Sequence, residues 1–420
     1  MKSPTRGAVL LLVAFATETT AVGIPPLPIG LNVYVLDIAC AVLFIAASLR
    51  YAERKVKINK ARAAVLAINL FFLVATVRGV AAFGVKDAGL ASRSLFYVYA
   101  SLLYFSSFRI REKQQREIVR VWLWIAAYLV GLALFRWVAT ALGLAIAASW
   151  MDAETSMMRV LNAQETGFLC FAFFFCLVLV SHGKATLLER VLMYVLPPVI
   201  ILLQHRTVWL LFIVGVLQMS GRARQIRKLI LSLLVVLLAA LVISLSLFKF
   251  VDLREMLIDS ATNSDTMMWR VGGWYQLVMN RNATVMDYLV GQPAGSDMTR
   301  VIGRNVVDAN PHNFYVQTYL CQGLVGLGIL LWLFFSRIRH ARRPLRSIQG
   351  RTCRRRSYIP QRMWPVFLVA MMLFSLTYPL HHTQAVLLGM AVAIMPETAK
   401  VRVKQVRRLV PTVRPASEPA

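Results

Sequence analysis

The chain has 420 residues, of which 58% are hydrophobic and 16% are charged. A water-soluble core cannot hold that much apolar surface, so the composition excludes a soluble globular protein and indicates many membrane spans. The formal net charge of +28 does not indicate nucleic acid, because the lysines and arginines fall in loops between apolar runs, where charge sets membrane orientation. The five cysteines lie in apolar runs or in one basic segment, so we expect no disulfide framework, no metal and no cofactor.

Twelve apolar runs predict an all-α polytopic membrane protein of about twelve transmembrane helices. The first run is interpreted as an uncleaved span rather than a signal peptide, because the chain behind it is also apolar. With the N-terminus inside, most of the 47 lysines and arginines fall on the inner side, so both termini are expected in the cytoplasm. The runs begin near Gly7, Leu31, Arg62, Ser94, Val121, Thr166, Arg190, Thr207, Lys228, Asn313, Trp364 and Thr383.

This topology divides the chain into four parts. Residues 1–249 carry spans one to nine, 250–311 form one long outer loop, 312–396 carry spans ten to twelve, and 397–420 form a basic cytoplasmic tail. A loop of that length is usually functional or disordered. Its tryptophans and methionines favour a folded cover on the membrane surface over disorder. The basic inner loops are interpreted as topology signals that also contact anionic lipids, without a catalytic role.

Charged side chains stand within or at the ends of the predicted spans, where a charge at the bilayer centre costs about 2.5 to 3.5 kcal/mol. The topology puts them toward the outer face, where arginine predominates and its planar guanidinium suits a phosphate group. For any single residue, snorkelling at a helix end or a structural pair such as Glu18 with Arg78 is the alternative. The charged residues are Glu18, Asp37, Arg78, Arg93, Arg136, Arg159 and Arg206.

Two arginines are the best candidates to bind such a ligand. Arg206 lies in a very short outer turn between two spans, which restricts its position. Arg270 lies in the outer loop, between Trp269 and a flexible glycine pair. We expect one to bind a phosphate from the membrane side and the other to bind it from above. An interfacial anchor is the alternative for Arg270.

The segment that follows the outer loop carries the candidate for chemistry. Asn310 is a good N-cap and Pro311 a good first helical residue, so we expect a helix with His312 in its first turn, at the membrane–water boundary. The positive end of a helix disfavours imidazolium and keeps the ring able to accept a proton. Gly323 and Gly326 fall on the same helical face as His312 and are expected to let a neighbouring helix approach closely. An interfacial histidine at the start of an ordinary span is the alternative.

These residues resemble a family motif. His312-Asn313, nine intervening residues and Gly323-Leu324-Val325-Gly326 match the His-Asn-x9-Gly-x-x-Gly pattern of the O-antigen ligase and O-antigen polymerase superfamily of bacterial inner membranes, which includes exopolysaccharide polymerases. The topology, the long outer loop, a glycine-proline turn at 289–295 and the positions of two arginines are also similar. His205 before Arg206 and Gln292 in the turn depart from the family pattern.

The resemblance implies a metal-independent glycosyltransferase at the periplasmic face, with a glycan on undecaprenyl pyrophosphate as donor. His312 would help to deprotonate the acceptor hydroxyl, while Arg206 and Arg270 would bind the pyrophosphate. A flippase and a chain-length regulator of the same pathway are the implied protein partners. The supporting candidates are Asn313, Arg78, Arg93 and Arg159.

Three functions are compatible with these observations. A polymerase accepts another lipid-linked repeat unit, whereas a ligase accepts lipid A-core, and we favour a polymerase for exopolysaccharide or O-antigen. Secondary transporters, including polysaccharide flippases, also have twelve spans with both ends inside. They usually carry two related halves and ionisable residues near the midplane, and the sequence shows neither.

Overall fold

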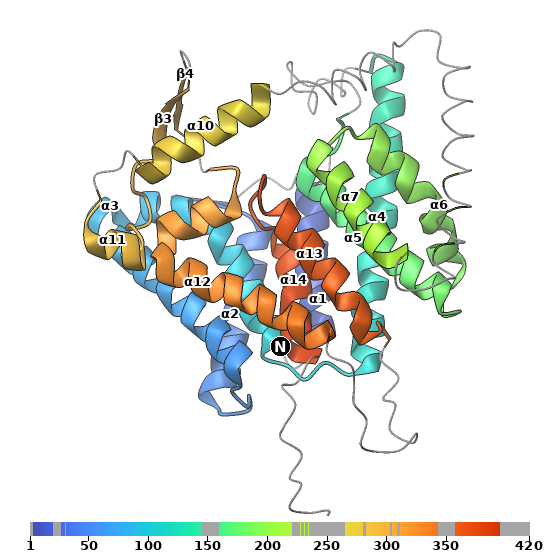
Figure 1. Cartoon of the computed structure of the whole chain (residues 1–420), viewed down its shortest axis with the longest axis horizontal. Helices are drawn as coiled ribbons and strands as arrows, with labels where there is room; N and C mark the ends of the chain where they lie inside the picture. Colours follow the sequence, from blue (N-terminus) through green and yellow to red (C-terminus); the bar gives the residue numbers. More distant parts are fainter. Residues whose placement is uncertain are drawn as a thin grey trace, which may run out of the picture.

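The fold is known from a computed structural model, which describes residues 3–19, 27–29, 31–144, 159–220, 265–279, 283–302, 305–308, 311–342 and 358–394, together with residues 227, 231 and 234. Most of these residues are helical (Figure 1). Five of the described helices are long and apolar enough to cross a membrane, as expected for an all-α membrane protein. The expected ninth span, the C-terminal tail and the first part of the outer loop lie mostly outside the described residues.

The helices follow the apolar runs of the sequence. In chain order they are α1 (Pro4–Glu18), α2 (Val35–Ala52), α3 (Lys60–Ser106), α4 (Glu112–Ala141), α5 (Ala163–Ser181), α6 (Leu187–Leu202), α7 (Arg206–Ser220), α10 (Asp265–Met279), α11 (Val285–Val290), α12 (Phe314–Arg342), the short 3-10 helix η3 (Gln361–Met363), α13 (Trp364–Phe374) and α14 (His382–Ile394). Two small antiparallel hairpins, which the sequence did not predict, are formed by β1 (Leu27–Ile29) with β2 (Leu31–Val33) and by β3 (Thr299–Ile302) with β4 (Asn305–Asp308).

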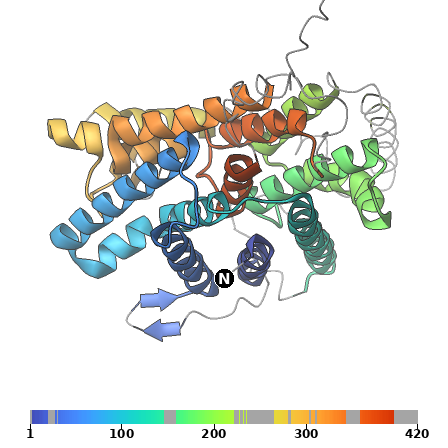
Figure 2. The same ribbon diagram turned by 90° about the horizontal axis from the view of Figure 1, so that it is seen from below.

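Helix α3 is in fact two antiparallel arms. An unbroken helix of its 47 residues would be about 70 Å long. However, Nε of Arg62, near its start, donates to the carbonyl of Ser106, at its end, at 2.9 Å. The chain reverses at Gly84, whose φ of 83° is left-handed, and Figure 2 shows the two arms side by side. Each arm is long enough to cross a bilayer, in agreement with the separate apolar runs that begin near Arg62 and Ser94.

The described part of the predicted outer loop is folded. We call residues 265–279, 283–302 and 305–308 the cover. Within it, the amide of Gln276 on α10 donates to the carbonyl of Val301 on β3 at 2.6 Å and accepts from the Val301 N–H at 3.0 Å. This pair of bonds fixes the hairpin to α10. Figure 1 shows both at the end of the molecule away from the N-terminus.

Main-chain hydrogen bonds attach the cover to the helices beneath it. The N–H of Gln292 donates to the carbonyl of Leu320 on α12 at 2.7 Å, and the N–H of Ala294 donates to the carbonyl of Ala75 on α3 at 2.9 Å. A side chain at Gly79 would collide with the backbone of Ala294, so glycine is needed for this approach. Residues 291–294 therefore form a seam between α3 and α12.

Helix α12 bends sharply on the other side of this seam. Gly323 has a φ of 65° and interrupts the helix, and a Cβ there would meet the backbone of Leu289 on α11. The expectation that Gly323 and Gly326 share a helical face with His312 is therefore wrong, because the helix does not run straight through this point. A neighbouring segment does approach Gly323, but it belongs to the cover. Gly326 faces the side chain of Gln322 on its own helix.

Candidate functional site

The structure places His312 one position before the N-cap of α12. The cap is Asn313, whose Oδ1 accepts from the N–H groups of Tyr315 at 2.9 Å and Val316 at 3.1 Å. The N–H of Phe314 donates to the carbonyl of Ser375, in the α13–α14 turn, at 3.0 Å. The expected helix start, with His312 in the first turn, is thus wrong by about one turn, and Asn310 lies outside the described residues. The supporting candidate Asn313 positions His312 indirectly, because it caps the helix that begins directly after these two residues.

His312 lies near two arginines of the cover. The residue as a whole is exposed, and neighbouring protein atoms cover part of the imidazole. Partial burial, followed by the positive charges of Arg270 and Arg300, lowers the pKa of His312 below its usual value. The ring is therefore neutral at pH 7 and can accept a proton there.

Arg270 extends from α10 to the α13–α14 turn. Its guanidinium donates to the carbonyl of Thr377 at 3.4 Å and lies 5.1 Å from the ring centre of Tyr378. Its Nε is buried and has no hydrogen-bond partner among the described residues. An unsatisfied buried donor costs about 1 to 3 kcal/mol, more when it is charged. A ligand with acceptor oxygens would satisfy this group.

Arg300 is a site residue that the sequence did not indicate. It lies on β3 and only 4% of its surface is exposed. One of its nitrogens donates to the carbonyl of Met298 at 3.2 Å. Its proximity to His312 depends on the hairpin and on the attachment of the hairpin to α10. The local sequence carries no signal for either feature, so Arg300 was indistinguishable from other loop arginines.

Arg206 approaches the same turn from another helix. It is the first residue of α7, and the next residue, Thr207, shares a hydroxyl–hydroxyl hydrogen bond of 2.8 Å with Thr377. On its other side, Nε2 of His205 lies 2.8 Å from the carbonyl of Leu161. The start of α7 and Arg270 thus meet at Thr377.

Arg159 lies close to His205, next to Arg206. The pKa of His205 is lowered to about 4, mainly by burial and also by the charge of Arg159, while the backbone hydrogen bond to Leu161 acts in the opposite direction. The Nε of Arg159 is also buried without a partner in the described part of the chain. We call His312, Arg270, Arg300, Arg206 and Arg159 the outer site.

Arg78 contacts residues of the cover and is not part of the outer site. Its guanidinium forms an ion pair with Asp287 on α11 at 2.8 Å and donates to the carbonyl of Gly291 at 2.6 Å. The contact with Gly291 fixes the seam from the α3 side, and the contact with Asp287 fixes α11. Arg78 therefore pairs with a residue of the cover, and Glu18 is not its partner.

Arg93 belongs to a second polar cluster. Its Nε lies 3.3 Å from Oδ1 of Asp37, and the hydroxyl of Tyr97 donates to the same oxygen at 2.6 Å. Another nitrogen of Arg93 donates to the carbonyl of Asn32 at 2.8 Å. These contacts join the start of α2 to the second arm of α3, and none of them involves the outer site.

The outer site contains one neutral base and several cations. Among the described residues, no group of three or more His, Cys, Asp or Glu side chains is placed to hold a metal ion. A comparison with protein-family models and with curated protein sequences finds no match for this chain.

Proposed function

We propose that the protein is a polysaccharide polymerase of a bacterial inner membrane, which joins repeat units linked to undecaprenyl pyrophosphate at the periplasmic face. The observation that carries the proposal is the outer site itself. A neutral His312 lies beside Arg270, which has an unsatisfied donor, and the buried Arg300. Exopolysaccharide and O-antigen are the product classes that the family resemblance suggests.

The proposed chemistry uses four of the five groups of the outer site. The acceptor hydroxyl oxygen attacks the anomeric carbon of the donor sugar, and the bond from that carbon to the pyrophosphate oxygen breaks. His312 takes the hydroxyl proton. The leaving pyrophosphate gains negative charge, which the guanidinium groups of Arg270, Arg300 and Arg206 would stabilise through hydrogen bonds to its oxygens. Neither a metal nor another cofactor is part of this proposal.

The topology belongs to the same proposal. The chain would cross the membrane about twelve times, with the cover in the periplasm and both termini in the cytoplasm. The concentration of lysine and arginine in the predicted inner loops supports this orientation. A flippase that supplies the donor and a regulator of chain length would be its partners.

The amount of polymer formed in cells tests whether His312 is the base. We expect His312→Ala to be inserted and expressed normally but to form no polymer, because the acceptor hydroxyl keeps its proton. His340→Ala, at the other end of α12, is the matched control and should form normal polymer. Normal polymer from a well-expressed His312→Ala protein would refute the proposed base.

The accumulated intermediate separates a polymerase from a ligase. A cell without polymerase activity keeps single repeat units on the carrier lipid or on lipid A-core. A cell without ligase activity keeps full-length polymer on the carrier lipid and leaves lipid A-core unmodified. Analysis of carrier-linked glycans in the His312→Ala strain should show single repeat units, and full-length carrier-linked polymer would assign the ligase function instead.

A further inference from the structure

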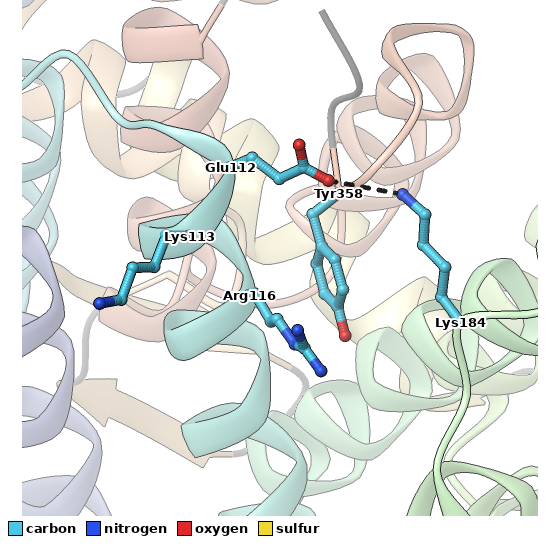
Figure 3. Close-up of a pocket in the computed structure, with 5 residues that line it drawn as sticks. All are labelled: Glu112, Lys113, Arg116, Lys184 and Tyr358. Carbon is cyan, nitrogen blue, oxygen red and sulfur yellow. Dashed lines mark ion pairs between the residues drawn. The ribbon is translucent and has the colours of Figure 1, made fainter.

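A cavity of about 500 Å³ lies at the opposite end of the molecule from the cover. It is formed by the first turns of α4, the connection between α5 and α6, and the segment just before η3. Figure 3 shows its lining side chains. They are Glu112, Lys113, Arg116, Lys184 and Tyr358.

The polar groups of this cavity are arranged around Tyr358. The Lys184 ammonium lies 5.6 Å from the centre of the Tyr358 ring and 3.7 Å from Oε1 of Glu112. In Figure 3 the guanidinium of Arg116 extends alongside the Tyr358 ring toward the hydroxyl end, while the Lys113 ammonium points away from the other groups. Tyr358 is buried, with 7% of its surface exposed.

The cavity has an excess of positive charge. Two cations, Arg116 and Lys184, face Tyr358 together with one carboxylate, which pairs with Lys184, while the Lys113 ammonium is directed away from them. Arg116 has no ion-pair partner among the residues that the structure describes. Arg120, one turn further along α4, adds positive charge near Tyr358. A guanidinium, an ammonium and a phenol hydroxyl together provide the donors that a phosphate group needs.

The adjoining surface favours a lipid as the source of that phosphate. Helix α6 begins three residues after Lys184 and carries three exposed hydrophobic side chains. They are Leu187, Val191 and Tyr194, which are 77%, 49% and 39% exposed. Their spacing places them on one helical face, which starts beside the cavity and can lie along acyl chains. Basic pockets between membrane helices on the cytoplasmic side are typical sites for anionic head groups.

We propose that this cavity binds the phosphate of an anionic phospholipid, with the acyl chains along the exposed face of α6. The proposal goes beyond the polymerase function and shares with it only the proposed topology, which puts the cavity on the cytoplasmic side. It differs from a general attraction of basic loops to the membrane, because it assigns binding to Arg116 and Lys184 and not to their neighbour Lys113.

Native mass spectrometry of the purified full chain tests this site. The protein in neutral detergent is titrated with phosphatidylglycerol, with phosphatidylcholine and with glycerol 3-phosphate. We expect phosphatidylglycerol to bind most tightly, and Arg116→Gln and Lys184→Gln each to weaken it about fivefold, the effect of about 1 kcal/mol for each cation near a membrane surface. Lys113→Gln, on the same helix turn, should bind as the unmodified protein does.

Two results would overturn the proposal. If Lys113→Gln weakens binding as much as Arg116→Gln does, the attraction is general and the cavity is not a site. If glycerol 3-phosphate binds as tightly as phosphatidylglycerol, the ligand is a free phosphate compound and the lipid assignment is wrong. Elution of each variant in size-exclusion chromatography separates lost binding from lost folding, and Tyr358→Phe, which keeps the packing, provides a second variant that should weaken binding.

Discussion

At the scale of single residues, the chemistry proposed for the outer site depends on the charge of one imidazole. Burial and two cations hold the pKa of His312 below its usual value. A depressed pKa keeps the base available at neutral pH, but it also makes the base weaker. The arginines therefore affect both halves of the proposed reaction, because they neutralise the leaving group and also prevent protonation of the base.

This coupling predicts a shift in pH dependence. Activity should fall in acid as His312 becomes protonated, with a midpoint below the usual histidine pKa of 6.5. Arg300→Gln removes a positive neighbour, which raises the pKa of His312, so the midpoint should move to higher pH. Polymer formation by purified protein in liposomes, measured from acidic to neutral pH, gives both midpoints. Identical midpoints would show that Arg300 does not act on the base.

A second prediction concerns the shape of the cation. Arg270→Lys keeps the charge but replaces the planar fork, which can bind two phosphate oxygens at once, by a single ammonium. If Arg270 binds the pyrophosphate in this way, we expect kcat/KM for the lipid-linked donor to fall about tenfold or more, which is about 1.4 kcal/mol of transition-state stabilisation. A nearly silent substitution would reduce Arg270 to an anchor over Tyr378.

The start of helix α12 is set by residues that lie far apart in the sequence. The sequence predicted Asn310 as the cap, whereas the structure caps α12 with Asn313, and a contact between distant parts of the chain accounts for the difference. The N–H of Phe314 bonds to Ser375, which places the first turn of α12 after Asn313. Local sequence could not reveal this, because Ser375 lies in the α13–α14 turn.

A substitution of the N-cap Asn313 should displace His312 even where the protein still folds. Asn313→Ala removes the acceptor for two N–H groups and should lower stability by about 1 kcal/mol. Asn313→Asp keeps an acceptor oxygen and should restore both stability and activity. The thermal unfolding temperature and the rate of polymer formation measure the two effects. An Asp variant that is stable but inactive would show that the amide itself contacts substrate.

At the scale of elements, the contact between the cover and α12 requires glycine on both sides, at Gly291 of the cover and at Gly323 of α12. Gly323→Ala would force a left-handed φ on alanine and a collision with Leu289, so we expect a loss of about 1 to 3 kcal/mol and a cover that is more open to protease. Gly328→Ala, on the same helix, meets open space and should be neutral or slightly stabilising. Limited proteolysis of both variants tests the difference.

The sequence predicted the elements better than their contacts. Apolar runs located α2, α4, α5 and both arms of α3, because hydrophobic length alone determines a span. The hairpin that carries Arg300 was missed, since its stability comes from α10. The partner of Arg78 was missed for the same reason, because Asp287 lies 209 residues away. Charge shows that a residue needs a partner, but it does not identify the partner.

At the scale of the whole molecule, orientation is the remaining prediction. Met286 on the cover and Ile58 between α2 and α3 are similarly exposed, at 60% and 59%. In the proposed topology a membrane-impermeant maleimide should label Met286→Cys in spheroplasts and should not label Ile58→Cys until the membrane is opened. The native cysteines in the described part of the chain are buried and should contribute little labelling. The reverse pattern would put the outer site in the cytoplasm and exclude the proposed reaction.

The seam also restricts how one carrier lipid could be exchanged for the next. Main-chain atoms of 291–294 join the cover to both α3 and α12, so a movement that keeps these bonds is a rotation about that line. Because Gln276 ties the hairpin to α10, such a rotation would move Arg270 and Arg300 away from His312 together. In the proposed reaction, product release would then separate the cations from the base in one step, and the part of the lowered pKa of His312 that their charges cause would disappear between catalytic cycles.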